Sequence, residues 1–111
     1  MTQQGEEVLA LPSQVTGTAY TPSRTDAGRV LEASNGSAVT ITLPTVAVAG
    51  WHVGTLMKVY QQGAGQVTTA GAGGVTLRSS GGKLKTAAQY SEITLRMRAN
   101  DEWVVSGDTT A

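Results

Sequence analysis

The chain contains no cysteine and no phenylalanine among its 111 residues, and it has three prolines and one histidine. Without cysteine, neither a disulfide framework nor a thiolate metal site can form. The single histidine, His52, excludes any site built from several imidazoles. No apolar run approaches the roughly 18 residues of a membrane-spanning helix. The first residues are polar and acidic and lack the basic start of a signal peptide.

Charge is also scarce. Charged residues make up 14% of the chain, against about 25% in an average soluble domain. Eight basic and eight acidic residues cancel. A neutral, sparsely charged surface disfavours nucleic acid or an anionic membrane as a partner, and it leaves little repulsion between copies of the chain.

Patterns of residues that carry chemistry are missing as well. The glycine clusters have neither the phosphate-loop spacing nor the dinucleotide spacing, and no Gly-x-Ser-x-Gly elbow is present. Adjacent carboxylates occur at Glu6–Glu7 and Asp101–Glu102, but neighbouring residues of an extended chain point to opposite faces. We therefore expect no enzymatic activity, no cofactor and no bound metal, with a small hydrolase using His52 as an alternative.

Glycine, threonine and valine are abundant instead, and they favour short strands separated by turns. Residues 38–43 and 92–98 alternate apolar and polar side chains, so each predicts a strand with one buried face. The sequence predicts an all-β fold: a compact sandwich or small barrel of about eight short antiparallel strands behind an irregular N-terminal arm. The expected core anchors are Val39, Ile41, Leu43, Ile93, Leu95, Met97 and Trp103.

Two turn signals organise these strands. Asn35–Gly36 predicts a hairpin, because both residues tolerate positive φ, and Asn100–Asp101 predicts the turn before a last strand at 102–106. We expect an arm over residues 1–14, one β domain over 15–108 and a polar tail over 109–111. No repeat at a solenoid period is expected, and the similarity between 38–43 and 66–77 is interpreted as compositional.

Several segments together resemble a small β domain of tailed-phage virion proteins. They are 26–32, 38–44, 63–68, 74–79, 82–85, 88–91 and 101–108, and the resemblance covers about residues 16–108. Such domains occur as head decoration (cement) proteins and at the ends of tail-fibre and minor structural proteins. The resemblance brings no catalytic residues with it.

The resemblance implies a decoration protein that binds the outside of the head, because the domain stands alone behind a short arm. The expected partners are the major capsid protein and further copies of the chain, with a trimer favoured. The expected location is the capsid surface of a virion, after synthesis in the host cytoplasm. The arm residues expected to contact the capsid are Glu6, Glu7, Val8, Leu9, Leu11 and Pro12.

The alternative is a tail-fibre or tail-tip module that binds a host surface glycan. Its motive is the same resemblance, together with Trp51 and Tyr90, which are predicted to lie in loops. Exposed aromatic rings suit sugar binding, whereas buried ones would serve the core. We expect Trp103 to be a core residue and leave Trp51 open between the two roles.

Overall fold

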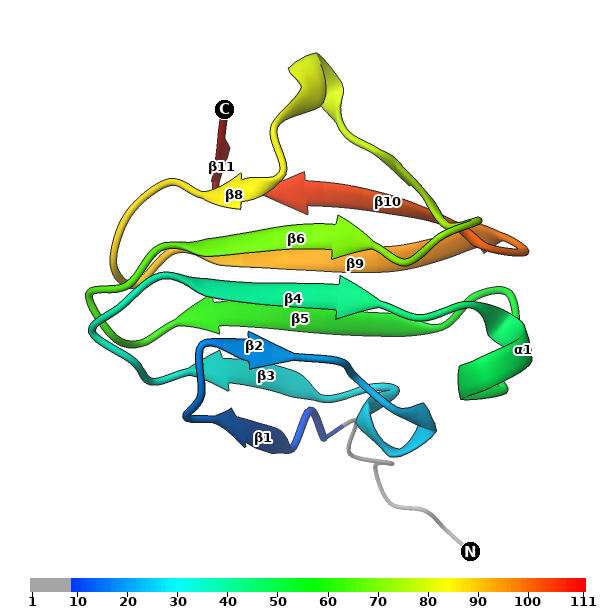
Figure 1. The fold of residues 1–111 in the computed structure, drawn as a ribbon, viewed down its shortest axis with the longest axis horizontal. Helices are drawn as coiled ribbons and strands as arrows, with labels where there is room; N and C mark the ends of the chain where they lie inside the picture. The colour runs from blue at the N-terminus through cyan, green and yellow to red at the C-terminus, as the bar shows by residue number, and fades with distance from the viewer. Residues whose placement is uncertain (1–8) are drawn as a thin grey trace, which may run out of the picture.

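A computed structural model describes residues 9–111 as eleven strands in two stacked sheets (Figure 1). Sheet A has six strands in the order β1-β3-β5-β9-β10-β7, and sheet B has five in the order β11-β8-β6-β4-β2. The expected all-β sandwich is therefore confirmed. The strands are β1 Pro12–Val15, β2 Ala19–Tyr20, β3 Val30–Ala33, β4 Val39–Leu43, β5 Leu56–Gln61, β6 Val67–Gly71, β7 Thr76–Arg78, β8 Lys85–Thr86, β9 Glu92–Ala99, β10 Glu102–Gly107 and β11 Thr109–Thr110. The short helices are η1 Arg24–Asp26, α1 Val46–Ala49 and η2 Ser80–Gly82.

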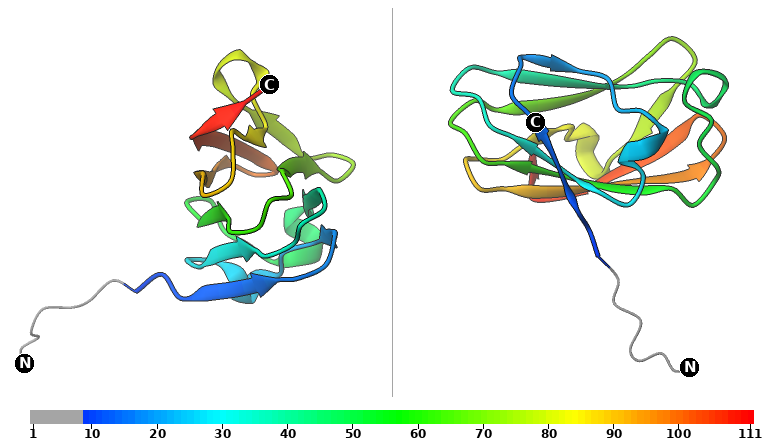
Figure 2. Two further views of the ribbon diagram at one scale, coloured as in Figure 1. Left: turned by 90° about the vertical axis from the view of Figure 1, so that its left-hand side faces the viewer. Right: turned by 90° about the horizontal axis from the view of Figure 1, so that it is seen from below.

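The first half of the chain is wound as a coil. From β1 to β9 each strand lies in the sheet opposite to that of the strand before it. Strands β1, β3 and β5 are parallel neighbours in sheet A, and β2, β4 and β6 are parallel neighbours in sheet B. Seen from below, the chain winds from one sheet to the other and back (Figure 2). We call the segment β1–β6 the coil.

The coil has a regular period over its last turn. Val30 pairs with Lys58 in sheet A and Val39 pairs with Val67 in sheet B, so both partners are 28 residues apart. Thr40 lies beside Thr68 in the same register. The similarity between residues 38–43 and 66–77 thus falls on neighbouring strands, and the expectation of no solenoid-like repeat is wrong.

The antiparallel expectation is also corrected. Five of the nine strand pairings are parallel and four are antiparallel. Asn35–Gly36 makes no hairpin, because β3 and β4 lie in different sheets. Neither of these two residues has a positive φ. The segment is instead a corner of the coil, where the chain crosses from sheet A to sheet B.

This corner is held by stacking on its neighbours. The Asn35 side-chain amide donates to the carbonyl of Thr16 in the turn before, at 2.9 Å. The Asn35 carbonyl accepts from the amide of Gly65 in the turn after, also at 2.9 Å. A Cβ on Gly65 would lie 1.8 Å from the carbonyl oxygen of Ser37. Glycine is therefore needed at residue 65 because backbone packs directly on backbone there.

The C-terminal hairpin has a different architecture. Strands β9 and β10 pair antiparallel across the turn at Asn100 and Asp101, as the sequence predicts. Strand β9 also pairs antiparallel with β5, which joins the hairpin to the coil. Alternation places Ile93, Leu95 and Met97 on the inner face of sheet A.

The core lies between the sheets. Its two largest residues are Trp51 and Trp103, whose rings meet edge to face with centroids 5.1 Å apart. Edge-to-face contact is the favoured geometry of such a pair. The seven expected core anchors are all buried: Val39, Ile41, Leu43, Ile93, Leu95, Met97 and Trp103.

The expected segment boundaries need two changes. Pro12, expected to lie in the arm, begins β1, which pairs with β3, so the arm ends before residue 12 rather than at 14. The expected tail contributes β11, whose Thr109 pairs with Thr86 of β8. Both short strands lack an alternating apolar pattern because only one or two of their residues reach the core.

Candidate functional site

The predicted contact arm is described only in part. Glu6, Glu7 and Val8 lie outside the described residues. Leu9 and Leu11 are 64% and 50% exposed, and Pro12 is exposed at the start of β1. Two leucines that precede the first strand thus present apolar surface to solvent.

A groove of about 400 Å³ runs where this segment meets sheet A. Leu9 and Ala10 form one side, and Leu56, which is 49% exposed, lies on β5. The groove is lined by Leu9, Ala10, Gly28, Arg29, Leu56, Met57, Lys58 and Thr94. We call this the arm-root groove. Its lining is apolar, with the basic side chains of Arg29 and Lys58 as its charged members.

The backbone around the groove is fixed by hydrogen bonds. The Val30 amide donates to the Leu11 carbonyl at 3.1 Å, and the Gly28 amide donates to the Leu56 carbonyl at 2.6 Å. Lys58 forms an ion pair with Glu92 on β9, with a nitrogen–oxygen distance of 3.4 Å. Both side chains of that pair are about half exposed, so it contributes little to stability.

A buried carboxylate anchors the same end of the fold. Asp26 in η1 is buried and accepts hydrogen bonds from the Ser13 hydroxyl at 2.8 Å and the Tyr20 hydroxyl at 2.7 Å. It also accepts from the Ser23 amide at 2.9 Å, which caps η1. Burial and the bond to Asp26 raise the pKa of Tyr20 to about 12. Sequence reasoning missed this cluster, although the Ser23-x-x-Asp26 spacing is a helix-start signal.

Strand β1 is an open edge of sheet A next to the groove. The amides of Val30 and Ser34 donate to the carbonyls of Leu11 and Val15, so odd-numbered residues of β1 face β3. Pro12, with no N–H, therefore faces outward. A proline at this position removes a free donor from the edge and discourages open-ended pairing with another strand.

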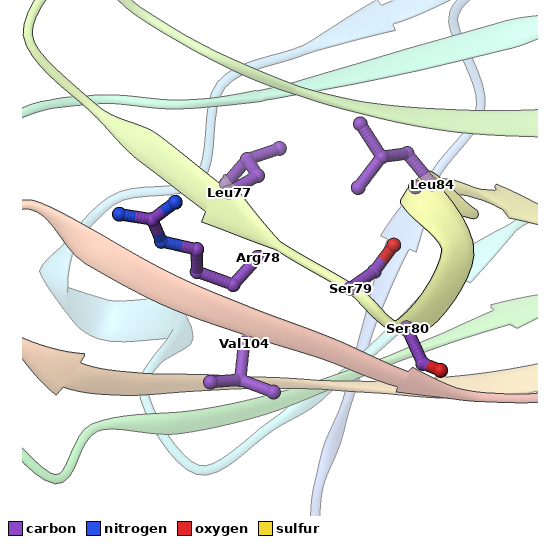
Figure 3. Close-up of a pocket in the computed structure, with 7 residues that line it drawn as sticks. Leu77, Arg78, Ser79, Ser80, Leu84 and Val104 are labelled. Carbon is purple, nitrogen blue, oxygen red and sulfur yellow. The ribbon is translucent and has the colours of Figure 1, made fainter.

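A second hollow, of about 340 Å³, lies beside η2 (Figure 3). It is lined by Leu77, Arg78, Ser79, Ser80, Gly82, Leu84 and Val104. The Arg78 guanidinium is engaged by Glu102 at 3.1 Å, and this hydrogen bond is the main cause of the lowered pKa of Glu102. The Ser79 hydroxyl is buried without a hydrogen-bond partner among residues 9–111.

The residues considered for catalysis are not brought together. His52 is exposed on its loop, where its carbonyl accepts from Thr55. The Asp101 carboxylate accepts from the Val46 amide at 2.7 Å, and Glu102 pairs with Arg78 and Arg98. Within the described part of the chain, no three His, Cys, Asp or Glu side chains are grouped as metal ligands.

The two aromatic residues of the glycan alternative have different outcomes. Trp51 is 3% exposed and packs in the core, so it is not available as a sugar platform. Its burial follows from its contact with Trp103, which a loop position in the sequence does not reveal. Tyr90 is 65% exposed and stacks against Tyr60, with ring centroids 6.4 Å apart.

No helix among residues 9–111 has the length and apolar character needed to cross a membrane. Comparisons of the chain with protein-family models, with curated proteins and with solved structures find no match.

Proposed function

We propose that this chain is a head decoration protein of a tailed phage, which binds the outside of the capsid and stabilises it by bridging capsid subunits. The observation that carries the proposal is the arm-root groove, where Leu9, Leu11 and Leu56 offer apolar surface beside the first strand. The resemblance of residues 16–108 to virion β domains supports the same role.

The size of this apolar surface bears on how the protein would bind. Each of the three leucines is roughly half exposed, so burying its remaining surface would contribute about 1 kcal/mol. A total of about 3 kcal/mol corresponds to weak binding by one copy. Stable attachment then requires several linked contacts, which a homo-oligomer provides through avidity. This supports the trimer as the proposed form.

Stiffness suits the role. Two sheets share one continuous core, and the coil is joined to the hairpin through the β5–β9 ladder. A rigid domain loses little conformational freedom on binding, so more of its contact energy appears as affinity.

The experiment adds the purified protein to undecorated heads of the phage that encodes it and images them by cryo-microscopy. We expect stoichiometric binding at fixed lattice positions. The double variant Leu9→Asp/Leu11→Asp should bind much more weakly while it keeps its fold, as checked by circular dichroism. Val48→Asp is the matched control, because Val48 is 78% exposed on α1, away from the groove lining.

Wild-type protein that binds no head would refute the proposal. Detection of the chain on the tail of intact virions would support the tail alternative instead. Equal binding by the leucine variant and the Val48 control would remove the arm-root groove as the contact surface.

A further inference from the structure

Tyr90 has an unusual conformation for its residue type. Its φ is +75°, and Tyr90 and Asp101 are the only non-glycine residues with positive φ in the described chain. A bulky side chain in this left-handed region costs free energy, and such strain tends to occur at functional positions. The ring is nevertheless 65% exposed, so burial does not repay this cost.

The surrounding structure holds Tyr90 in place. Its amide donates to the Gln61 carbonyl at 2.7 Å, and the next residue, Ser91, is buried. The Ser91 hydroxyl donates to Asp108 at 2.7 Å and accepts from the Ala88 amide at 3.0 Å. A buried polar network thus fixes the backbone of a residue whose side chain lies in solvent.

A row of polar side chains leads across sheet A to this aromatic pair. Gln14, Glu32, Tyr60 and Glu92 are register neighbours on β1, β3, β5 and β9. All four face outward, because the residues that alternate with them are buried. Adjacent strands lie about 4.8 Å apart, so the row is about 14 Å long. The Gln14 amide donates to Glu32 at 2.7 Å, which orients both groups.

We propose that Tyr60, Tyr90 and this row form a binding platform for a neutral saccharide chain. The apolar C–H face of a pyranose ring packs well on an aromatic ring, whose face is electron-rich. Planar amide and carboxylate groups beside it match the closely spaced hydroxyls of a sugar. A platform of about 14 Å accommodates two to three sugar units.

The composition of the surface favours a saccharide over a protein partner. The other large exposed apolar residues are Leu9, Leu11, Val48, Val53 and Leu56. They belong to the arm root, to α1 and to the loop before β5, at the opposite end of the strands (Figure 1). Tyr90 therefore lacks the contiguous apolar surroundings typical of the core of a protein interface.

The charges of the row favour a neutral ligand. Glu92 is paired with Lys58 at 3.4 Å, which leaves Glu32 as an acidic group whose described partner is the uncharged Gln14. An acidic saccharide would bring like charge to Glu32. The platform lies away from the arm-root groove, so the inference does not depend on the proposed attachment to heads.

The test titrates isotope-labelled protein with neutral hexasaccharides of glucose, galactose and N-acetylglucosamine, and with oligogalacturonate as the acidic counterpart. We expect at least one neutral probe to shift amide signals of Tyr60, Tyr90 and Glu32, and the acidic probe to bind less well. Tyr90→Phe keeps the ring and should bind within about threefold of wild type. Tyr90→Asn should weaken binding at least tenfold, because asparagine tolerates the left-handed conformation but has no ring.

Val48→Ala is the control for loss of an exposed apolar side chain elsewhere, and it should bind as wild type does. The proposal is overturned if no neutral probe binds, or if Tyr90→Asn binds as tightly as Tyr90→Phe. It is also overturned if Tyr90→Asn abolishes attachment to heads while no saccharide binds, which would assign the platform to a protein contact.

Discussion

The coil and the C-terminal hairpin build one sandwich by two different means. In the coil, strands of one to two turns earlier become parallel neighbours, and backbone stacks on backbone at corners such as Asn35 and Gly65. In the hairpin, β9 and β10 pair across a two-residue turn, and large side chains such as Trp103 fill the core. The coil thus depends on the absence of side chains at a few positions, and the hairpin depends on their presence.

The largest expected effect tests the corner of the coil. Gly65→Ala places a Cβ 1.8 Å from the Ser37 carbonyl oxygen and 2.8 Å from that of Asn35. Because backbone atoms on both sides must move, we expect a loss of about 3 kcal/mol in the free energy of unfolding. Denaturant unfolding followed by tryptophan fluorescence measures it.

Gly36→Ala is the control in the same corner. A Cβ on Gly36 meets nothing within 4 Å, and its φ is not positive. We expect a change below about 0.5 kcal/mol. Equal stability of the two variants would show that the corners of the coil do not stack as described.

An intermediate effect is expected where the hairpin turn contacts the coil. Asp101 has a φ of +55°, and its carboxylate accepts from the Val46 amide at the start of α1. Asp101→Ala loses this hydrogen bond and forces alanine into the left-handed region, so we expect a loss of about 2 kcal/mol. Asp101→Asn keeps both an acceptor and the tolerated conformation, and it should lose less than about 0.5 kcal/mol.

Thermal unfolding of the two Asp101 variants side by side makes the measurement. If alanine is tolerated as well as asparagine, the turn stands independently of α1, and the two regions are less coupled than the hydrogen bond implies.

The smallest effect concerns pH at the open end of the coil. Tyr20 has an ordinary pKa of 10.0, which burial and the bond to Asp26 raise to about 12 in the folded chain. The neutral phenol is favoured by folding, so this stabilisation is complete below pH 10 and is lost as pH rises toward 12. Tyr20 is partly exposed, so the change is small.

Unfolding free energies of wild type and Tyr20→Phe, measured from pH 9 to pH 12, isolate the contribution. The other tyrosines and the lysines titrate in both proteins, so the difference between the two curves reports Tyr20. The wild-type advantage at pH 9 should shrink as pH rises. A constant difference across this range would show that the phenol–carboxylate bond does not depend on the proton of Tyr20.

The predictability of the elements follows the same division. Strands β4 and β9 were predicted closely, because an alternating pattern reports on one buried face within a single segment. The turn at Asn100–Asp101 was predicted because its partner strands are adjacent in sequence. Asn35–Gly36 was misread, because the same residues that favour a hairpin also suit a corner between two sheets.

The candidate sites were only partly predictable. Leu9 and Leu11 were named from the sequence, but Leu56 was not, because its place in the groove depends on β5 lying beside the arm root. Trp51 and Tyr90 were equivalent loop aromatics in the sequence. Their fates differ because Trp51 meets Trp103 in the core, whereas Tyr90 is directed outward by a backbone conformation that no local pattern reveals.

Composition and period-two alternation by themselves determined that the chain forms short strands with one apolar face, because side chains of a strand alternate whatever its neighbours are. They also determined which residues of β4 and β9 enter the core. Only the tertiary structure decided that partners 28 residues apart pair in parallel, because that choice depends on how both sheets close over a shared core. The outward row from Gln14 to Glu92 exists for the same reason, since its members come together only through that register.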